Sequence, residues 1–287
     1  MHKKSSLAPW YFLTPALIMF LIFVLIPIAQ SLSLSFYEWD GIGQKTWIGF
    51  DNYRELFEDE NFWISLTNNI YWLVCFLIAP VVGLFLALFL NQQVLGIKAV
   101  KSLFFLPFVI SQVVVGLVFS WFYDPNYGLL SHLMEPFGWE PIAILADETL
   151  VTFGIIAAGL WPQISYCMIL YLTGLNSLDP QQIEAARLDR VRGLKLLWFV
   201  ILPQLRPATF MAIVVTVIGA LRSFDLVAIM TDGGPYGSSS VLAYFMYEQS
   251  IFNYRMGYGA TIATILFMIM NGYIAFFIWR MLRSEGT

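Results

Sequence analysis

Six long apolar stretches alternate with polar segments along this chain of 287 residues. A helix needs about 20 apolar residues to cross a bilayer, and each stretch reaches roughly that length. Their spacing predicts an all-α, polytopic membrane protein with six transmembrane helices. The expected spans are about 10–34, 68–90, 103–123, 150–172, 207–230 and 257–279.

The N-terminal region raises the question of a cleaved signal peptide, because basic residues precede the first apolar stretch. That stretch is too long for a signal sequence, so we expect an uncleaved first span. The predicted organisation is a short cytoplasmic N-terminal tail, one transmembrane permease domain and a C-terminal tail. These parts cover residues 1–9, 10–283 and 284–287.

Composition agrees with a membrane protein. The chain is 59% hydrophobic and only 12% charged, whereas a soluble domain is about 25% charged. The charges are segregated between the two sides of the expected membrane. Acidic segments at 38–61 and 129–148 lie on one side, and most basic residues lie on the other. The positive-inside rule then places both termini and the loop at 176–206 in the cytoplasm. The basic residues on that side are Lys3, Lys4, Lys98, Lys101, Arg187, Arg190, Arg192, Lys195, Arg206, Arg280 and Arg283.

The cytoplasmic loop at 176–206 is polar and helix-prone. Asp179 can cap a helix, and Pro180 suits its first turn. We expect a short helix on the membrane surface, followed by a break at Gly193. The small side chains of Ala185 and Ala186 let another protein approach closely.

This loop resembles the EAA loop of ABC importer permeases. The resemblance rests on Glu184-Ala185-Ala186, on Asp189 five residues after the Glu, and on the closing Leu202-Pro203. In that family the loop forms a coupling helix that docks into a groove of the cytoplasmic ATPase. The family usually has Gly directly after the Asp, where this chain has Arg190. The docking residues implied by the resemblance are Glu184, Ala185, Ala186, Asp189 and Gly193.

Two further segments are similar to sugar-importer permeases of the maltose type, namely residues 49–53 and Gly233-Gly234-Pro235. The resemblance implies the type I ABC importer permease fold in a bacterial inner membrane. It also implies a second homologous permease subunit in a heterodimer, two cytoplasmic ATP-binding subunits and an extracytoplasmic substrate-binding protein. It implies no nucleic-acid partner.

The chain itself is expected to be non-catalytic and to hold no cofactor. It has no Walker-type loop, so ATP and Mg²⁺ belong to partner subunits. His2 and His132 are isolated and Cys75 and Cys167 lie in apolar spans, so we expect no metal site or disulfide framework. The expected cargo is a sugar or sugar-like solute, such as an oligosaccharide or glycosylated polyol. Alternatives are a glycerol-3-phosphate-like solute or, from another class, a stand-alone secondary transporter.

Charged residues at membrane depth usually face the protein interior or a water-filled path. Arg222 and Asp225 are three residues apart in the expected fifth span, hence on one helical face, with Ser223 beside them. They either line the substrate pathway or form an intrahelical ion pair that holds helices together. Hydrogen-bonding and aromatic residues in other spans suit a sugar, although packing or an interfacial position is the commoner role of such residues. These candidates are Asn68, Tyr71, Gln112, Trp121, Gln163, Tyr166 and Asn271.

Overall fold

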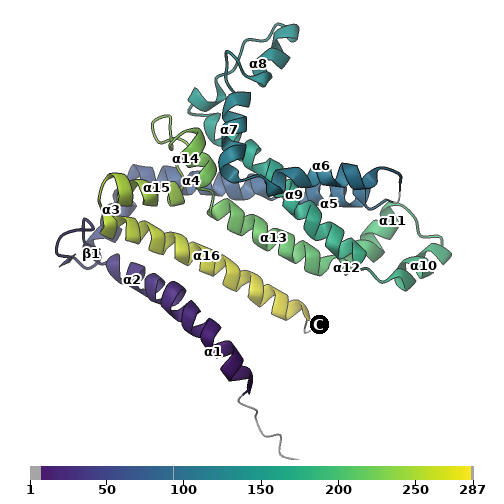
Figure 1. Cartoon of the computed structure of the whole chain (residues 1–287), viewed down its shortest axis with the longest axis horizontal. Coiled ribbons are helices and arrows are strands. Elements are labelled where there is room, and N and C mark those ends of the chain that lie inside the picture. Colours follow the sequence, from purple (N-terminus) through teal and green to yellow (C-terminus); the bar gives the residue numbers. More distant parts are fainter. Residues whose placement is uncertain (1–7, 93, 286–287) are drawn as a thin grey trace, which may run out of the picture. The chain divides into compact units, whose positions relative to one another are not determined.

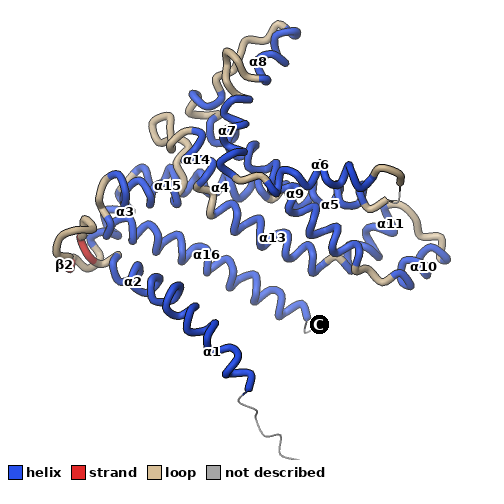
Figure 2. Tube along the Cα trace, in the orientation of Figure 1, coloured by secondary structure: helices blue, strands red, loops and turns tan. Residues whose placement is uncertain are grey.

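Helices make up nearly all of the computed structural model, which describes residues 8–92 and 94–285 (Figures 1 and 2). His2, Lys3 and Lys4 lie outside the described residues. Within them, four helices are long and apolar enough to cross a membrane, and two bent helix pairs raise that number to six if each pair is one span. The predicted all-α membrane fold is confirmed. The four are Trp10–Leu34, Glu60–Leu90, Val151–Asn176 and Met256–Phe277.

The expected span at 103–123 is not a single straight helix. Two helices, α6 (Ile97–Val109) and α7 (Gln112–Phe122), meet there at 98°. Ile110 and Ser111 between them have extended backbones, and the Ser111 side chain caps α7 by accepting a hydrogen bond from Val114 N at 3.4 Å. A capped new helix start explains the sharp change of direction.

The expected span at 207–230 is also interrupted. Helix α13 (Arg206–Leu221) ends three residues before α14 (Asp225–Met230) begins. On its other side, α13 turns by 73° from the preceding helical segment Leu194–Gln204. Pro207 lies in the first turn of α13, where its missing N–H costs nothing. The proline thus favours a new helix at this bend rather than a straight continuation.

The chain divides into two units, and the first contains residues up to Glu60 together with Phe245–Ile269. Asn52 donates hydrogen bonds to the carbonyl oxygens of Ser35 and Tyr37, both at 3.0 Å, and fixes the end of the first span. Arg255 binds both carboxylate oxygens of Glu55 at 2.6 Å. Burial and the nearby charge of Asp59 raise the pKa of Glu248. The elements of this unit are α1 (Ala8–Phe20), the π-helical turn η1 (Leu21–Leu25), α2 (Ile26–Leu34), β1 (Tyr37–Glu38), β2 (Thr46–Trp47), α3 (Asp51–Glu58), the π-helical turn η5 (Glu248–Phe252) and the first half of α16 (Met256–Glu285).

The second unit contains Asn61–Tyr244 and the chain from Met270 onward. Its centre is α9, which packs against α5, α6, α7, α13 and α14 (Figure 1). The helices approach closely at Gly83, because a Cβ there would lie 2.7 Å from Cys167 Cβ. Besides α6, α7, α13 and α14, its elements are α4 (Glu60–Phe76), α5 (Ile78–Leu90), α8 (Leu129–Met134), the 3-10 turns η2 (Glu135–Phe137) and η3 (Ile144–Ala146), α9 (Val151–Asn176), α10 (Pro180–Leu188), α11 (Leu194–Leu196), the π-helical turn η4 (Leu197–Ile201), α12 (Leu202–Gln204) and α15 (Leu242–Tyr247).

The loop that follows α14 is fixed to α4 by side-chain hydrogen bonds. Asn68 donates to the carbonyl oxygens of Ser238 and Ser240 at 2.6 and 2.8 Å. One residue further on, the Asn69 side-chain oxygen accepts from Leu242 N at 2.9 Å. Both asparagines are buried, so these bonds satisfy backbone groups that water does not reach. Asn68 therefore serves to position the loop.

Replacing Gly83 with Ala should destabilise the second unit by about 1–3 kcal/mol, because the added Cβ overlaps the α9 backbone as well as Cys167. Thermal unfolding in detergent measures the loss. Gly272→Ala is the matched control, since a Cβ there meets no atom within 4 Å. Equal thermal midpoints for the Gly83 variant and wild type would contradict the close α5–α9 contact.

Replacing Asn68 with Ala leaves the Ser238 and Ser240 carbonyl oxygens without these donors. We expect a loss of about 1–3 kcal/mol in the free energy of unfolding, and faster proteolysis of the loop at 231–241. Tyr71→Phe, three residues away on a half-exposed side chain, should change neither measurement. Unchanged proteolysis of the Asn68 variant would show that these hydrogen bonds do not hold the loop.

Candidate functional site

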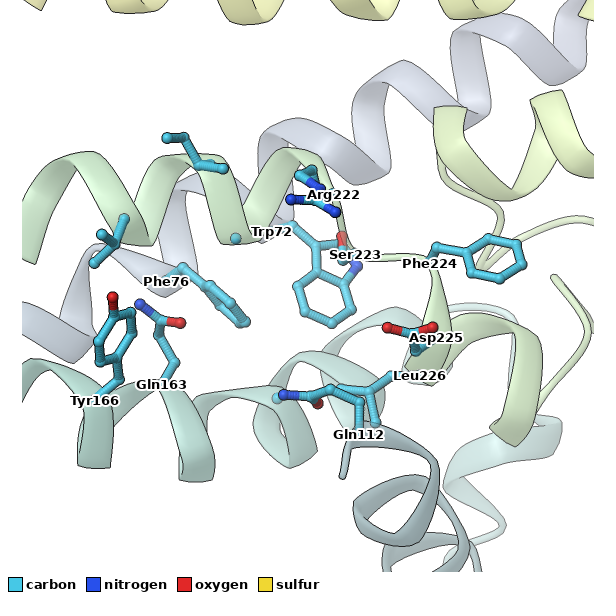
Figure 3. Close-up of a pocket in the computed structure, with 14 residues that line it drawn as sticks. Trp72, Phe76, Gln112, Gln163, Tyr166, Arg222, Ser223, Phe224, Asp225 and Leu226 are labelled. Carbon is cyan, nitrogen blue, oxygen red and sulfur yellow. The ribbon is translucent and has the colours of Figure 1, made fainter. Parts of the chain in front are cut away.

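A pocket of about 410 Å³ opens in the second unit between α4, α7, α9, α13 and α14 (Figure 3). Gln163 and Tyr166 reach it from α9, and Gln112 reaches it from the first turn of α7. Six of the expected pathway residues thus meet in one place. They are Gln112, Gln163, Tyr166, Arg222, Ser223 and Asp225, and they are joined by Trp72, Phe76, Gly159, Val215, Ile218, Gly219, Phe224 and Leu226.

The interruptions inside the two expected spans, 103–123 and 207–230, border the pocket. Gln112 follows the break between α6 and α7, and residues 222–224 form the break between α13 and α14. Backbone groups freed at a break cannot face lipid, because the hydrocarbon offers no hydrogen-bond partner. Irregular backbone at membrane depth is tolerated where protein covers it or where it lines a watery cavity. Two such breaks at one pocket favour a water-filled path.

Of the two alternatives for Arg222 and Asp225, the intrahelical ion pair is wrong. The helix ends at Leu221, so the two residues do not share a helical face. No ion pair joins them in the described structure, and both are exposed in the single chain. Figure 3 shows both side chains at the same pocket. A guanidinium and a carboxylate are therefore available to hydrogen-bond a polar ligand.

Trp72 is a pocket residue that sequence analysis missed. Its side chain is 1% exposed, and its Nε1–H has no hydrogen-bond partner in the described structure. An orphan buried donor is costly, and here it belongs to a side chain that lines the pocket. The signal available in the sequence was spacing, because Trp72 and Phe76 follow Asn68 at intervals of four on one helical face.

Other polar pocket residues already have partners in the protein. Gln163 Nε2 donates to Thr216 Oγ1 at 2.9 Å, and Ser223 Oγ donates to the Ala220 carbonyl oxygen at 2.7 Å. The Tyr166 ring stacks on Phe108 with centroids 4.9 Å apart. These contacts hold the pocket wall in shape. Groups left without a described hydrogen-bond partner include those of Trp72, Gln112, Arg222 and Asp225.

Four expected pathway residues do not line this pocket. Asn68 anchors the loop after α14, and the Tyr71 ring packs 5.4 Å from Phe153. Trp121 is 57% exposed on α7, and Asn271 is exposed on α16. Their residue types suited a sugar, but Asn68 lies at another level of α4 and the other three lie away from the pocket walls. Among the described residues, no three His, Cys, Asp or Glu side chains gather as a metal site.

The expected surface helix in the loop at 176–206 is present as α10, and it begins as predicted. The Asp179 carboxylate accepts from Gln181 N at 2.9 Å, and Pro180 occupies the first turn. Glu184 and Ala185 are exposed, and Leu188 is 85% exposed. Leu194 of the same loop is 73% exposed as well, so the loop presents more than one apolar side chain beside its charges. Figure 1 shows α10 near α11 and α12.

The turn after α10 has a Schellman-type ending. Val191 N donates to the Ala186 carbonyl oxygen at 2.9 Å, and Arg190 N donates to the Arg187 carbonyl oxygen at 3.1 Å. This arrangement needs a left-handed residue after the helix cap. Arg190 occupies that position with φ 62°. The chain thus makes this turn with an arginine, a residue that has a Cβ, rather than with a glycine.

Helices α9 and α13 connect the loop to the pocket. The Gln204 side chain, one residue after Pro203, accepts from Asp179 N at 3.1 Å and so joins the two ends of the loop. A Cβ on Gly174 of α9 would lie 2.8 Å from Ala208 Cβ of α13, so the two helices touch there. Gln163 lies near the middle of α9, and Arg222 follows the last residue of α13. Movement of the loop can therefore reach the pocket through two packed helices.

Comparison with known proteins agrees with this arrangement. Residues 79–284 match the family described as binding-protein-dependent transport system inner membrane component. The chain is 35% identical to the probable ABC transporter permease protein YurN of Bacillus subtilis over 94% of each chain. It is 28% identical to the sn-glycerol-3-phosphate transport system permease protein UgpA of Agrobacterium fabrum, over 95% of this chain and 94% of that protein.

A solved structure has the same fold. It is a bacterial ABC transporter involved in the import of the acidic polysaccharide alginate, and its matching chain is 22% identical with a TM-score of 0.85. The match covers 96% of this chain and 95% of that one. Sequence, helix arrangement and the exposed loop helix lead to one conclusion: the chain belongs to the binding-protein-dependent transport system inner membrane components, the multi-pass permeases of ABC transporters.

Proposed function

We propose that this chain forms one half of the translocation pathway of an ATP-driven importer for a sugar or sugar-like solute. The observation that carries the proposal is the pocket at two broken helices, joined through α9 and α13 to an exposed loop helix. A second homologous permease forms the other half of the path. Two cytoplasmic ATPase subunits and an extracytoplasmic substrate-binding protein complete the importer.

The exposed charges at the pocket support a second membrane subunit. Arg222 and Asp225 lie within the expected fifth span, yet the single chain leaves both uncovered. Charges exposed to hydrocarbon are costly, and they persist where protein or water surrounds them. A second permease packed over this side encloses the pocket and supplies the remaining walls. The site is therefore shared between two subunits.

Coupling runs from the ATPases to the pocket. ATP and Mg²⁺ bind the partner subunits, and closure of the ATPase dimer moves α10, which docks through Glu184, Ala185, Ala186, Asp189 and Gly193. Helices α9 and α13 carry this movement to Gln163, Tyr166 and Arg222. The path then switches between inward-facing and outward-facing states. This chain is non-catalytic and holds no cofactor, and both of its termini are cytoplasmic.

The pocket chemistry favours a neutral, polyhydroxylated solute. Trp72, Phe76 and Tyr166 offer aromatic surface, while Trp72 Nε1, Asp225 and Gln112 offer hydrogen-bonding groups. A glycerol-3-phosphate-like cargo is the second candidate, since one relative at 28% identity is named for it. Arg222 is the one basic residue among those lining the pocket, and Asp225 offsets its charge. That balance favours the neutral solute over the phosphate.

Purification of the full chain from native membranes in mild detergent tests the assembly. We expect a second permease and an ATPase to co-purify, with ATPase activity stimulated by the matching binding protein. Substrate bound to that protein then identifies the cargo. Recovery of this chain alone, with transport into liposomes that lack ATPases, would instead support a stand-alone secondary transporter centred on Arg222 and Asp225.

Replacing Glu184 with Lys should leave the chain in the membrane but lower ATP-dependent transport at least roughly tenfold, since losing a charged contact at an interface costs about 2–5 kcal/mol. Transport in proteoliposomes and co-purification of the ATPase measure the two effects. Gln182→Lys introduces the same lysine side chain on the opposite face of α10 and is the control. Normal transport by the Glu184 variant would argue against docking through this residue.

Replacing Trp72 with Phe removes the indole N–H while retaining an aromatic ring. We expect the transport rate at saturating binding protein to fall roughly three- to tenfold, the value of one neutral hydrogen bond. Trp121→Phe, on an exposed side chain outside the pocket, should change the rate by less than about twofold. Equal effects of the two substitutions would mean that Trp72 has no special contact with the solute.

A further inference from the structure

The turn that ends α10 contains a strained residue. Arg190 has φ 62°, a left-handed backbone conformation that is unfavourable for residues with a Cβ. Glycine makes the same two backbone hydrogen bonds without this strain. The backbone geometry therefore does not account for an arginine. Strain at one exposed position points to a role for its side chain.

The Arg190 side chain has no counterpart within its own chain. It is exposed, and in the described structure it makes no ion pair or side-chain hydrogen bond. The nearest acidic residue in sequence, Asp189, caps the helix and also shows no ion pair with it. A guanidinium carries five N–H donors in a fork that matches a carboxylate. The guanidinium is therefore available to a carboxylate from outside the chain.

The surroundings of Arg190 are positively charged. Arg187, Arg192 and Lys195 are exposed near it in the sequence, and the acidic residues Glu184 and Asp189 offset only part of this charge. The hydrogen bonds of the turn fix Arg190 directly beyond the last residues of α10. Arg190 thus lies at the edge of the surface that we propose for ATPase docking. The hydrogen bonds of the turn fix its backbone there.

We propose that Arg190 forms an ion pair with a carboxylate at the rim of the ATPase groove that receives α10. The inference rests on the proposed docking of this helix and adds the partner's chemistry, an acidic side chain opposite the turn. A charge-assisted, two-point contact of this kind gives orientation as well as affinity. It makes the turn a determinant of which ATPase this permease accepts, since a neutral or basic rim leaves Arg190 without its counter-charge.

The test uses the assembled permease pair in nanodiscs of neutral lipid and the ATPase subunit that co-purifies with it. Arg190→Gly should raise the Kd for the ATPase about tenfold, while the thermal midpoint of the permease stays equal or rises because strain is relieved. Arg190→Lys keeps the charge and should bind more tightly than Arg190→Gly. Arg192→Ala, an exposed arginine outside the turn's hydrogen bonds, should change the Kd by less than about twofold.

Each other outcome overturns the inference. If the Kd of the Arg190→Gly variant for the ATPase stays within twofold of wild type, the proposed ion pair does not exist. An equal loss in Arg192→Ala indicates a general positive field rather than one contact. If the Arg190→Gly variant loses affinity for the ATPase only in nanodiscs that contain anionic lipid, the guanidinium binds lipid phosphate instead. Glu184→Lys separates this inference from the docking itself: normal ATPase binding by that variant defeats docking through α10, whatever Arg190 does.

Discussion

A bilayer offers no hydrogen-bond partner to a backbone N–H or carbonyl group, and this constraint governs where the helices of the protein can end. Most of its apolar segments meet the constraint by remaining helical across the whole predicted span. Two do not, at Ile110–Ser111 and at residues 222–224. Both interruptions border the same pocket. The two positions where a helix does not continue across the bilayer are thus the positions suited to a polar solute.

The pocket and the loop helix depend on the same two helices. Helix α9 carries Gln163 near its middle and packs against α13 through Gly174 near its end. Helix α13 has 16 residues, which corresponds to about 24 Å at 1.5 Å per residue. The core between them includes Cys167, Tyr171 and Ala212. Tightly packed helices move as bodies rather than deform, so displacement at one end of this pair reaches the other.

Local backbone chemistry decides how the loop helix is presented. An Asp-Pro start and a left-handed turn at Arg190 limit α10 to Pro180–Leu188. The Gln204 side chain joins the loop's end to its beginning at Asp179. The short helix consequently stays exposed without a large core of its own. Its apolar and charged side chains are left free for contact with another protein.

Sequence alone determined the membrane class, the approximate spans and the start of the loop helix, because apolar length and the Asp179 cap are local properties. The end of that helix at Leu188, before the expected break at Gly193, came from the structure. The sequence also named six residues that meet at the pocket. Only the tertiary structure separated these from Asn68, Tyr71 and Trp121, since residue type does not reveal which side of a helix meets the others. The tertiary structure likewise ended α13 before Arg222 and brought in Trp72. Helix breaks and pocket walls arise from contacts between segments far apart in the chain, such as α4 with α9 and α14 with α7. Hydrophobic periodicity indicates local secondary structure and does not predict those contacts.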